Sequence, residues 1–200
     1  MANIFRVTVD AKEMMKLQIR LGAYAKQAPA IVSRALNRAA TTTRSAAVKE
    51  ARTNYYVKAS AVRETFAINK ASKGRLTASV YSQAGSLPLD KFKFSPKQPR
   101  PQNPQTLKVA AKKTGMKELR HAFVANVSGI KIFERTGEFD KAKKGRYKGK
   151  RREKIKRLMG PPIPIMVGNA KTREAVERKS AETYEKRLEH EIKRVQEAGK

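Results

Sequence analysis

Apolar residues recur with a helical period at both ends of this chain and with a strand period in between. From Met14 to Ala28 they lie three or four positions apart, which places them on one face of a helix. Similar spacing recurs between Val176 and Val195. Intervening segments alternate polar and apolar residues, as half-buried strands do. The pattern predicts an α+β fold in which long N-terminal helices and a long C-terminal amphipathic helix pack on an antiparallel sheet.

The first part of the chain predicts one strand and two helices. Residues 3–9 alternate, and Asp10 then precedes Glu13 by three positions, the spacing of a capping box at a helix N-terminus. The second helix is expected over residues 29–54 and is rich in alanine. One of its faces is therefore suited to close packing on a sheet or on a neighbouring helix.

Short strands and turns are expected in the middle of the chain. Residues 122–127 and 130–135 flank Ser128 and Gly129 and predict a hairpin, although the alternation leaves its register open. Gly115 predicts a turn. The other expected elements are a short helix over 60–66 and strands over 67–69, 75–82, 87–94 and 106–111.

The last helix is expected over residues 169–199, with Asn169 as its N-cap. Residues 171–200 contain nine basic and seven acidic side chains, which can pair at i,i+3 or i,i+4 spacing. The segment is therefore almost neutral, unlike the rest of the chain.

Proline interrupts the pattern in two places. Residues 95–104 contain four prolines, which exclude a helix or a central strand. This segment is either a surface loop or an arm that becomes ordered against a neighbouring subunit. The uncharged segment 158–167 is stiff and apolar, so it docks on its own sheet or on a partner. The residues assigned to this docking are Met159, Gly160, Pro161, Pro162, Ile163, Pro164 and Ile165.

Charge is the main functional signal. The 200 residues, expected to form a single domain, carry 46 Lys and Arg against 17 Asp and Glu, a net charge of +29. Residues 140–157 alone hold eleven basic and two acidic side chains, within a basic loop expected over 137–157. Such a cluster either binds DNA or an acidic partner without sequence preference, or is only a solvated loop. The candidate contact residues are Lys141, Lys143, Lys144, Arg146, Lys148, Lys150, Arg151 and Arg152.

The residues do not form a pattern typical of an enzyme. Cysteine is absent, which excludes a thiolate metal site, a disulfide or a cysteine nucleophile. His121 and His190 have no partner at metal-binding spacing, the carboxylates are scattered, and the glycines do not form a phosphate-binding motif. We therefore expect no catalytic residue, no metal site and no cofactor. The chain also lacks a signal-peptide pattern and an apolar run long enough for a membrane span, so a soluble protein with no membrane partner is expected.

Two segments resemble a known family. IKIFERTG at residues 130–137 and RREKIKRLMGPPIPIMVG at residues 151–168 are similar to segments of the minor tail protein Z family of lambda-like phages and prophages. The alanine-rich helix with TTTR at residues 41–44, the first strand and the last helix are also similar, so the resemblance covers almost the whole chain. Pro162 departs from the family pattern, which has a small polar residue there.

The resemblance implies a structural tail-completion protein of a long, non-contractile phage tail. Family members act late in tail assembly at the head-proximal end, in head joining and in positioning the DNA end. The implied partners are other copies of the chain in a ring, of which a hexamer is one form, and tail terminator, tail tube or head-connector proteins. Non-specific contact with phage DNA is also implied. The implied location is the virion tail, with the host cytoplasm as the site of assembly.

A second function class is a nucleic-acid-binding protein of ribosomal or nucleoid type, which composition alone favours. Against this class, the sequence contains no aromatic RNA-binding motif and no zinc finger, and its last thirty residues are nearly neutral.

Overall fold

The computed structural model describes residues 2–82, 85–99, 105–146, 148–168 and 170–198. The fold is α+β with antiparallel sheets, as predicted. Residue contacts divide the chain into two compact units. Unit 1 comprises Met1–Thr53, Ala59–Gly85 and Ile163–Lys200, and unit 2 comprises Asn54–Lys58 and Ser86–Pro162. The expectation of a single domain stays a prediction.

Unit 1 contains most of the helices. Its N-terminal helix begins as predicted, because the side chain of Asp10 accepts a 2.7 Å hydrogen bond from the backbone N–H of Glu13. The 3-10 helix that follows ends where the second long helix begins. The elements are β1 (Ala2–Thr8), α1 (Ala11–Leu21), η1 (Gly22–Gln27), α2 (Ala28–Asn54, whose last residue belongs to unit 2), α3 (Ala59–Arg63), β2 (Phe66–Asn69), β3 (Thr77–Ser82), α4 (Ile163–Val167) and α5 (Ala170–Glu197).

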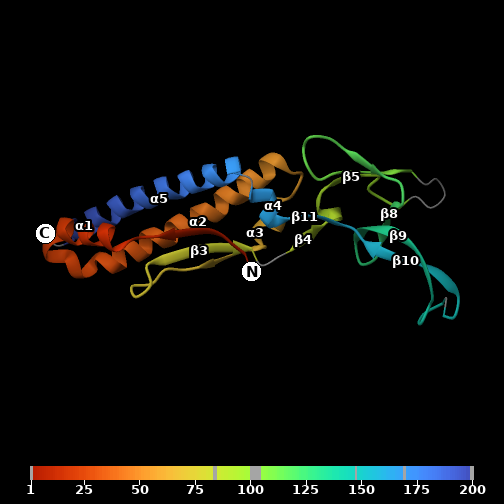
Figure 1. Cartoon of the computed structure of the whole chain (residues 1–200), viewed down its shortest axis with the longest axis horizontal. Coiled ribbons are helices and arrows are strands. Elements are labelled where there is room, and N and C mark those ends of the chain that lie inside the picture. Colours follow the sequence, from red (N-terminus) through yellow and green to blue (C-terminus); the bar gives the residue numbers. More distant parts are fainter. Residues whose placement is uncertain (1, 83–84, 100–104, 147, 169, 199–200) are drawn as a thin grey trace. The chain divides into compact units, whose positions relative to one another are not determined.

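Helices α2 and α5 run antiparallel, side by side (Figure 1). Two contacts fix their direction: Thr43 donates a buried 2.7 Å hydrogen bond to Ser180, and Arg34 pairs with Glu191 at 2.6 Å. The small-residue face of α2 is fully buried, including Ala35, Ala39, Ala40 and Ala47. The predicted close packing of this face is confirmed. Small side chains let the two helix backbones approach closely. The buried hydroxyl groups of Thr43 and Ser180 bond to each other at this contact, so neither is left without a hydrogen-bond partner.

A three-stranded sheet with the order β1-β3-β2 completes unit 1. Both pairings are antiparallel, and Val80 of the central strand is opposite Phe5 on one side and Ile68 on the other. The Asn37 side chain of α2 exchanges two hydrogen bonds with the backbone of Ala71, just after β2. This amide joins the helix layer to the sheet.

Unit 2 is built from strands. Its elements are β4 (Ser86–Pro88), η2 (Leu89–Lys91), β5 (Lys93–Ser95), β6 (Leu107–Ala110), β7 (Lys117–Leu119), β8 (Ala122–Asn126), β9 (Ile130–Lys141), β10 (Arg151–Arg157) and β11 (Met159–Pro162). They form three small antiparallel sheets, β10-β9-β8, β5-β6-β7 and β11-β4. The buried apolar residues include Phe92, Phe94, Leu107, Val124 and Ile132.

Several sequence predictions for unit 2 hold and others fail. The 122–135 hairpin is confirmed. Its register, which the sequence left undecided, places Val124 opposite Ile132 and Asn126 opposite Ile130. The single strand over 87–94 is wrong, because η2 separates β4 from β5. Asp90 in η2 accepts a 2.8 Å charged hydrogen bond from Arg157, and Leu89 N–H bonds to Leu158 O. These long-range partners hold a turn that alternation cannot reveal.

The proline-rich segment lies partly outside the described residues. Ser95 ends β5, residues 96–99 have no regular structure, and residues 100–104 are not described. Asn169, the predicted cap of the last helix, is also outside the described residues. The helix itself is confirmed over Ala170–Glu197.

The basic loop predicted over 137–157 is wrong. Strand β9 continues to Lys141 and strand β10 begins at Arg151, so much of the predicted loop is strand. The sequence RREKIKR has one apolar residue, Ile155, and hence no alternating pattern. Its strand is held by the backbone ladder with β9 instead, which any side chain permits.

A buried carboxylate anchors α5. The Glu191 side chain is 1% exposed and contacts three arginines: Arg34 and Arg187 at 2.6 Å and Arg194 at 3.1 Å. Burial raises the pKa of Glu191, but the hydrogen bond from Arg34 and the three positive charges outweigh burial and hold the pKa below its usual value. This cluster stabilises the α2–α5 pair through long-range and i,i+3 or i,i+4 contacts together.

Replacing Glu191 tests this anchor. Glu191→Gln leaves three neighbouring guanidinium groups without a counter-charge, so we expect a loss of about 3 kcal/mol in the free energy of unfolding at neutral pH. Urea titration followed by circular dichroism measures it. The control is Glu189→Gln, which breaks the exposed Arg20–Glu189 pair and should cost under about 1 kcal/mol. Equal losses in the two variants would contradict the assignment.

The same carboxylate predicts an acid dependence. Because the folded state lowers the pKa of Glu191 below 4.5, its stabilisation is complete above that pH and is lost as the pH falls through the lowered value. The wild-type unfolding free energy should therefore decline more steeply below pH 4.5 than that of Glu191→Gln. Urea titrations at several pH values give both curves, and parallel curves would refute the prediction.

Candidate polyanion-binding hairpin

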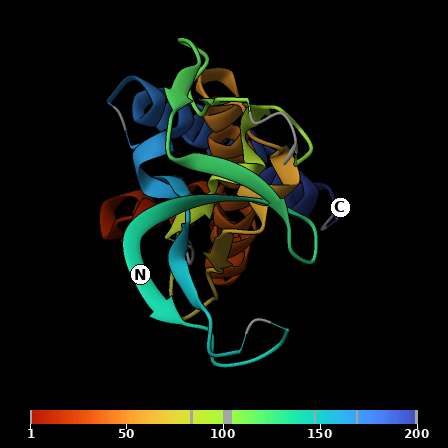
Figure 2. The same cartoon turned by 90° about the vertical axis from the view of Figure 1, so that its right-hand side faces the viewer.

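Strands β9 and β10 form a curved, two-stranded hairpin (Figure 2). Near its base Phe133 of β9 faces Phe123 of β8, with ring centroids 6.1 Å apart. Beyond that point every described residue from Arg135 to Arg152 is exposed, except the buried Ala142. The outer half of the hairpin therefore offers its side chains to solvent or to a partner.

An irregularity interrupts the ladder midway. Glu153 is opposite Phe139 and Ile155 is opposite Arg135, so three residues of β9, Thr136–Glu138, face Lys154 alone. Gly137 has a φ of 76°, a left-handed conformation that glycine adopts without strain. Such a bulge bends the bulged strand and increases its twist, consistent with the curvature of β9.

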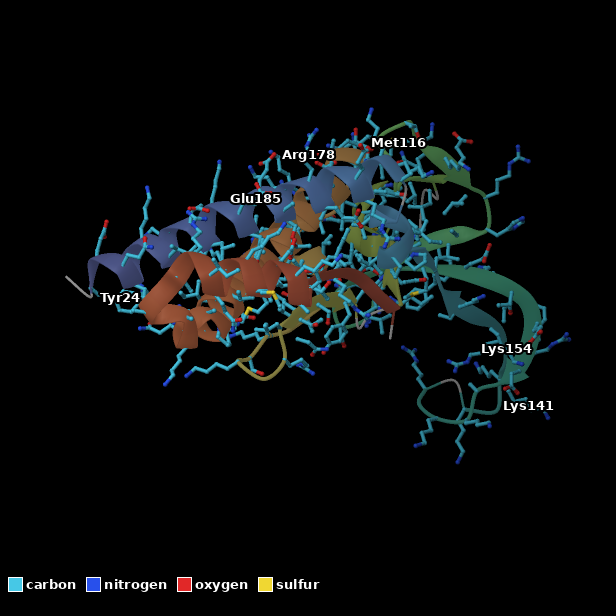
Figure 3. The ribbon with its side chains drawn as sticks, turned by 60° about the vertical axis from the view of Figure 1, so that its left-hand side comes forward. Tyr24, Met116, Lys141, Lys154, Arg178 and Glu185 are labelled. Carbon is cyan, nitrogen blue, oxygen red and sulfur yellow. The ribbon has the colours of Figure 1, made fainter. Side chains whose placement is uncertain are left out.

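The Glu153 carboxylate clamps this bulge. One oxygen accepts a 3.0 Å hydrogen bond from the Gly137 N–H, and the other accepts one from Arg135 at 3.0 Å. The next residue of β10, Lys154, pairs with Glu138 of β9 at 3.0 Å. The hydrogen bond to Glu138 and the charge of that carboxylate raise the pKa of Lys154. Figure 3 shows Lys154 and Lys141 on this hairpin. Two acidic residues of the hairpin, Glu138 and Glu153, are thus engaged at the bulge.

Next to the tip, cross-strand neighbours place charges in pairs. Asp140 is opposite Arg152, and Lys141 is opposite Arg151. The Arg151 guanidinium lies 4.5 Å from the centroid of the Phe139 ring, a cation–π contact. Phe139 itself is 53% exposed. One aromatic ring therefore positions one arginine at the base of the tip.

The tip is closed by its own backbone. Ala142 N–H bonds to Lys150 O at 3.0 Å, and Gly149 N–H bonds to Ala142 O at 2.8 Å. Lys148 N–H bonds to Gly145 O at 3.0 Å, and both Gly145 and Gly149 have positive φ values. We call residues 141–152 the basic tip. It contains the eight cations singled out from the sequence and no carboxylate: Lys141, Lys143, Lys144, Arg146, Lys148, Lys150, Arg151 and Arg152.

Five basic side chains also line a hollow of about 740 Å³ on the hairpin. Lys141, Lys143 and Lys144 contribute from the β9 side, and Arg152 and Lys154 from the β10 side. Asp140 and Glu153 are the two carboxylates in its wall. The hollow therefore has an excess of positive charge and fits an anionic ligand.

The predicted docking segment is divided between the two units. Met159, Gly160, Pro161 and Pro162 form β11, which pairs with β4 inside unit 2. Ile163, Pro164 and Ile165 begin α4 in unit 1, where Ile163 is fully buried. The sequence left two alternatives for this segment, docking on the chain's own sheet or on a partner. The β11 part docks on the chain's own strand β4. Met159 (49%) and Ile165 (62%) are exposed and remain candidates for partner contact.

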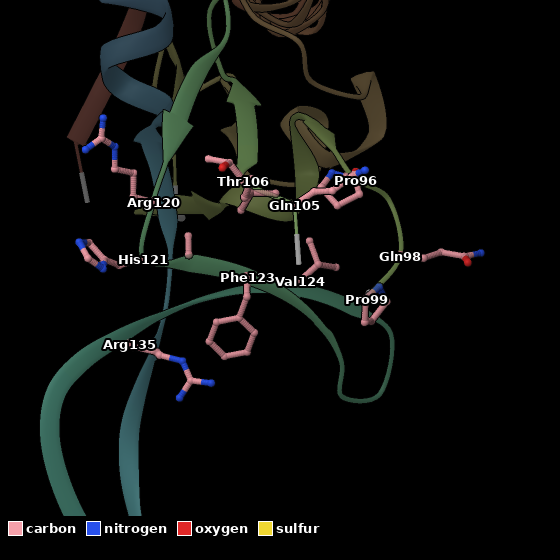
Figure 4. A pocket seen from close by; sticks show the side chains of 12 residues that line it. Pro96, Gln98, Pro99, Gln105, Thr106, Arg120, His121, Phe123, Val124 and Arg135 are labelled. Atoms are coloured by element: carbon pink, nitrogen blue, oxygen red, sulfur yellow. The ribbon is translucent and has the colours of Figure 1, made fainter. Parts of the chain in front are cut away.

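A second hollow lies beside β8 in unit 2 (Figure 4). It measures about 600 Å³, and its walls include Pro96, Pro99, Phe123, Arg120 and His121. The Arg135 guanidinium is 5.2 Å from the Phe123 ring centroid. His121, one of the two histidines, thus sits in a turn next to arginines. His190 is exposed on α5.

Two features are absent from the described residues. No helix among them is long and apolar enough to cross a membrane. The described residues also contain no group of three or more His, Cys, Asp or Glu side chains that could hold a metal ion.

Comparison with protein-family models, curated proteins and solved structures finds no match to this chain.

The density of basic residues predicts the cations of the tip, but it does not predict that Glu153 holds the bulge of β9. Glu153 is an isolated acid in a basic run, and nothing in its neighbours indicates a clamp. The only signal was Gly137, which breaks the apolar alternation of β9 where the bulge occurs.

Removing the clamp should loosen the bulge. In Glu153→Ala the Gly137 amide loses its charged acceptor, so we expect its hydrogen exchange to accelerate by about tenfold. NMR exchange measurements on the full chain test this. Glu118→Ala, which breaks the exposed Lys108–Glu118 pair elsewhere in unit 2, should leave the Gly137 rate unchanged. An unchanged rate in Glu153→Ala would show that the clamp is not needed.

Gly160 is required by packing in β11. A Cβ added there would overlap the ring of Phe92, which is 4% exposed and cannot swing into solvent. We expect Gly160→Ala to lower the unfolding free energy by about 1–3 kcal/mol. In the Phe92→Leu background the same change should cost less, because the smaller side chain leaves room. Urea titration of the four proteins measures the coupling, and additive losses would contradict the overlap.

Proposed function

We propose that this chain is a structural subunit of a long, non-contractile phage tail. It acts late in assembly at the head-proximal end, where it completes the tail for head joining and DNA positioning. The proposal assigns it no catalytic activity and no cofactor. Its partners are further copies of itself in a ring, which a hexamer would satisfy, and tail terminator, tail tube or head-connector proteins. Its location is the virion tail, after assembly in the host cytoplasm.

The observation that carries this proposal is the exposed β9–β10 hairpin with its basic tip. The two sequence segments that resemble the tail protein family form the first part of β9, then β10, β11 and α4, and the basic loop lies between them. A hairpin whose outer half is exposed adds little burial to its own unit, yet ordering it costs conformational entropy. Like charges at this density repel one another, and a bound polyanion reduces that repulsion. A subunit beside packaged DNA would meet that condition.

Self-association is the first test. The purified chain, treated with nuclease, should form a discrete ring that electron microscopy and light scattering detect. A protein that becomes monomeric once nucleic acid is removed, and that binds RNA or DNA with steep salt dependence, would favour the alternative. That alternative is a nucleic-acid-binding protein of ribosomal or nucleoid type, and the basic tip is the observation in its favour.

The exposed apolar side chains at the two ends of the docking segment are the candidate ring contacts. We expect the double variant Met159→Ser, Ile165→Ser to reduce the ring fraction in light scattering, because each change removes exposed apolar area from an interface. The matched control is Met116→Ser, Val127→Ser, which alters two other exposed apolar residues. Rings that persist in the first variant, or that are lost equally in both, would count against these contacts.

A further inference from the structure

We propose that the basic tip, residues 141–152, binds the phosphate backbone of duplex DNA without reading its sequence. This inference rests on the proposed function for the source of the DNA, and it names the ligand of the hairpin. It is carried by three features of the hairpin: the sign of its charges, the kind of basic residue, and the shape that presents them.

The sign of the charges is uniform where the hairpin is most exposed. Carboxylates occur on both sides of the tip, at Asp140 and Glu153, and none occurs between them. Glu153 is directed to Gly137 and Arg135, and Glu138 to Lys154. The bulge therefore uses its acids internally, and the tip presents eight cations in twelve residues. Such a surface selects a ligand of uniformly negative charge, as a nucleic-acid backbone is.

The kind of residue favours phosphate over an acidic protein. Five of the eight cations are lysines: Lys141, Lys143, Lys144, Lys148 and Lys150. Lysine is depleted from protein–protein interfaces, where buried aromatic residues and arginine contribute most of the affinity. Phosphate contacts also accept lysine, which binds as a point charge, and each neutralised phosphate releases counterions. A lysine-rich tip is thus better matched to a nucleic-acid backbone.

The shape favours a duplex. A two-stranded antiparallel ribbon fits the major groove of B-form DNA, which is about 12 Å wide. The backbone bonds between Ala142, Lys150 and Gly149 keep the tip a compact turn. Arg151 rests on Phe139, and the basic hollow of about 740 Å³ lies along the same strands. The ribbon would therefore place cations on the phosphates that border the groove. No side chain of the tip is assigned to a base edge.

Salt dependence of DNA binding tests the inference. The full chain is titrated with a 30-base-pair duplex of mixed sequence between about 50 and 300 mM salt. The tip variant Lys143→Gln, Lys144→Gln, Arg146→Gln, Lys148→Gln removes four positive charges. Each phosphate contact contributes about 0.9 to the slope of log K against log salt. We expect the slope to fall by about three to four and the affinity near 100 mM salt to fall at least about tenfold.

The control has the same composition and the same net charge. Lys91→Gln, Lys112→Gln, Lys117→Gln, Arg120→Gln also replaces three lysines and one arginine, all exposed and all in unit 2. It should change the slope by less than about one. Equal losses in both variants, or no loss in the tip variant, would overturn the inference. If the quadruple tip variant does not fold by circular dichroism, Lys143→Gln, Lys144→Gln should lower the slope by about two.

Two further ligands separate the competing partners. Polyglutamate represents an acidic protein, and tip-dependent binding of polyglutamate with tip-independent binding of DNA would overturn the inference. Tighter binding of single strands or transfer RNA than of the duplex would also overturn it. Equal affinity for duplexes of different sequence supports backbone recognition. Ring assembly is measured on the same proteins, so failure of DNA binding with rings intact leaves the tail-subunit proposal standing.

Discussion

Repulsion among like charges is the constraint to which this structure responds. With 46 basic and 17 acidic side chains, carboxylates are scarce, and their positions decide which cations are compensated. Three of them lie where parts of the fold are held together. Glu191 gathers three arginines at the α2–α5 contact, Asp90 pairs with Arg157 between η2 and β10, and Glu153 closes the bulge of β9. At the end of the hairpin, residues 141–152 contain eight basic side chains and no acidic one.

Much of the fold could be predicted because periodicity reports burial. The alanine face of α2 and the apolar face of α5 around Val176 and Ile192 are buried. The alternation at 122–135 predicts the hairpin β8–β9. The Asp10 cap was visible because capping depends on residues three positions apart. Each of these features is local, so the sequence within a few residues contains the information.

The errors arise where long-range contacts replace local pattern. RREKIKR forms a strand because β9 supplies backbone partners, and its charged side chains can remain in solvent on both faces of a two-stranded ribbon. The short turn at Leu89–Lys91 depends on Leu158 and Arg157, which are nearly seventy residues away in the chain. Among the site residues, the eight cations were identifiable from their density alone. Glu153 was not, because its role exists only once the ladder places it opposite Phe139, where its carboxylate reaches the Gly137 N–H.

Order and charge at the basic tip are thermodynamically linked. The turn is held by a few backbone hydrogen bonds and by Gly145 and Gly149 in left-handed conformations, against the mutual repulsion of its cations. Salt screens this repulsion over about 8 Å at physiological ionic strength, so neighbouring cations on the turn still interact. A bound polyanion removes the repulsion without disturbing the backbone bonds. A ligand that binds the closed turn more tightly than the open one stabilises the closed turn. If the basic tip binds a polyanion as proposed, binding and closure of the turn would therefore stabilise each other.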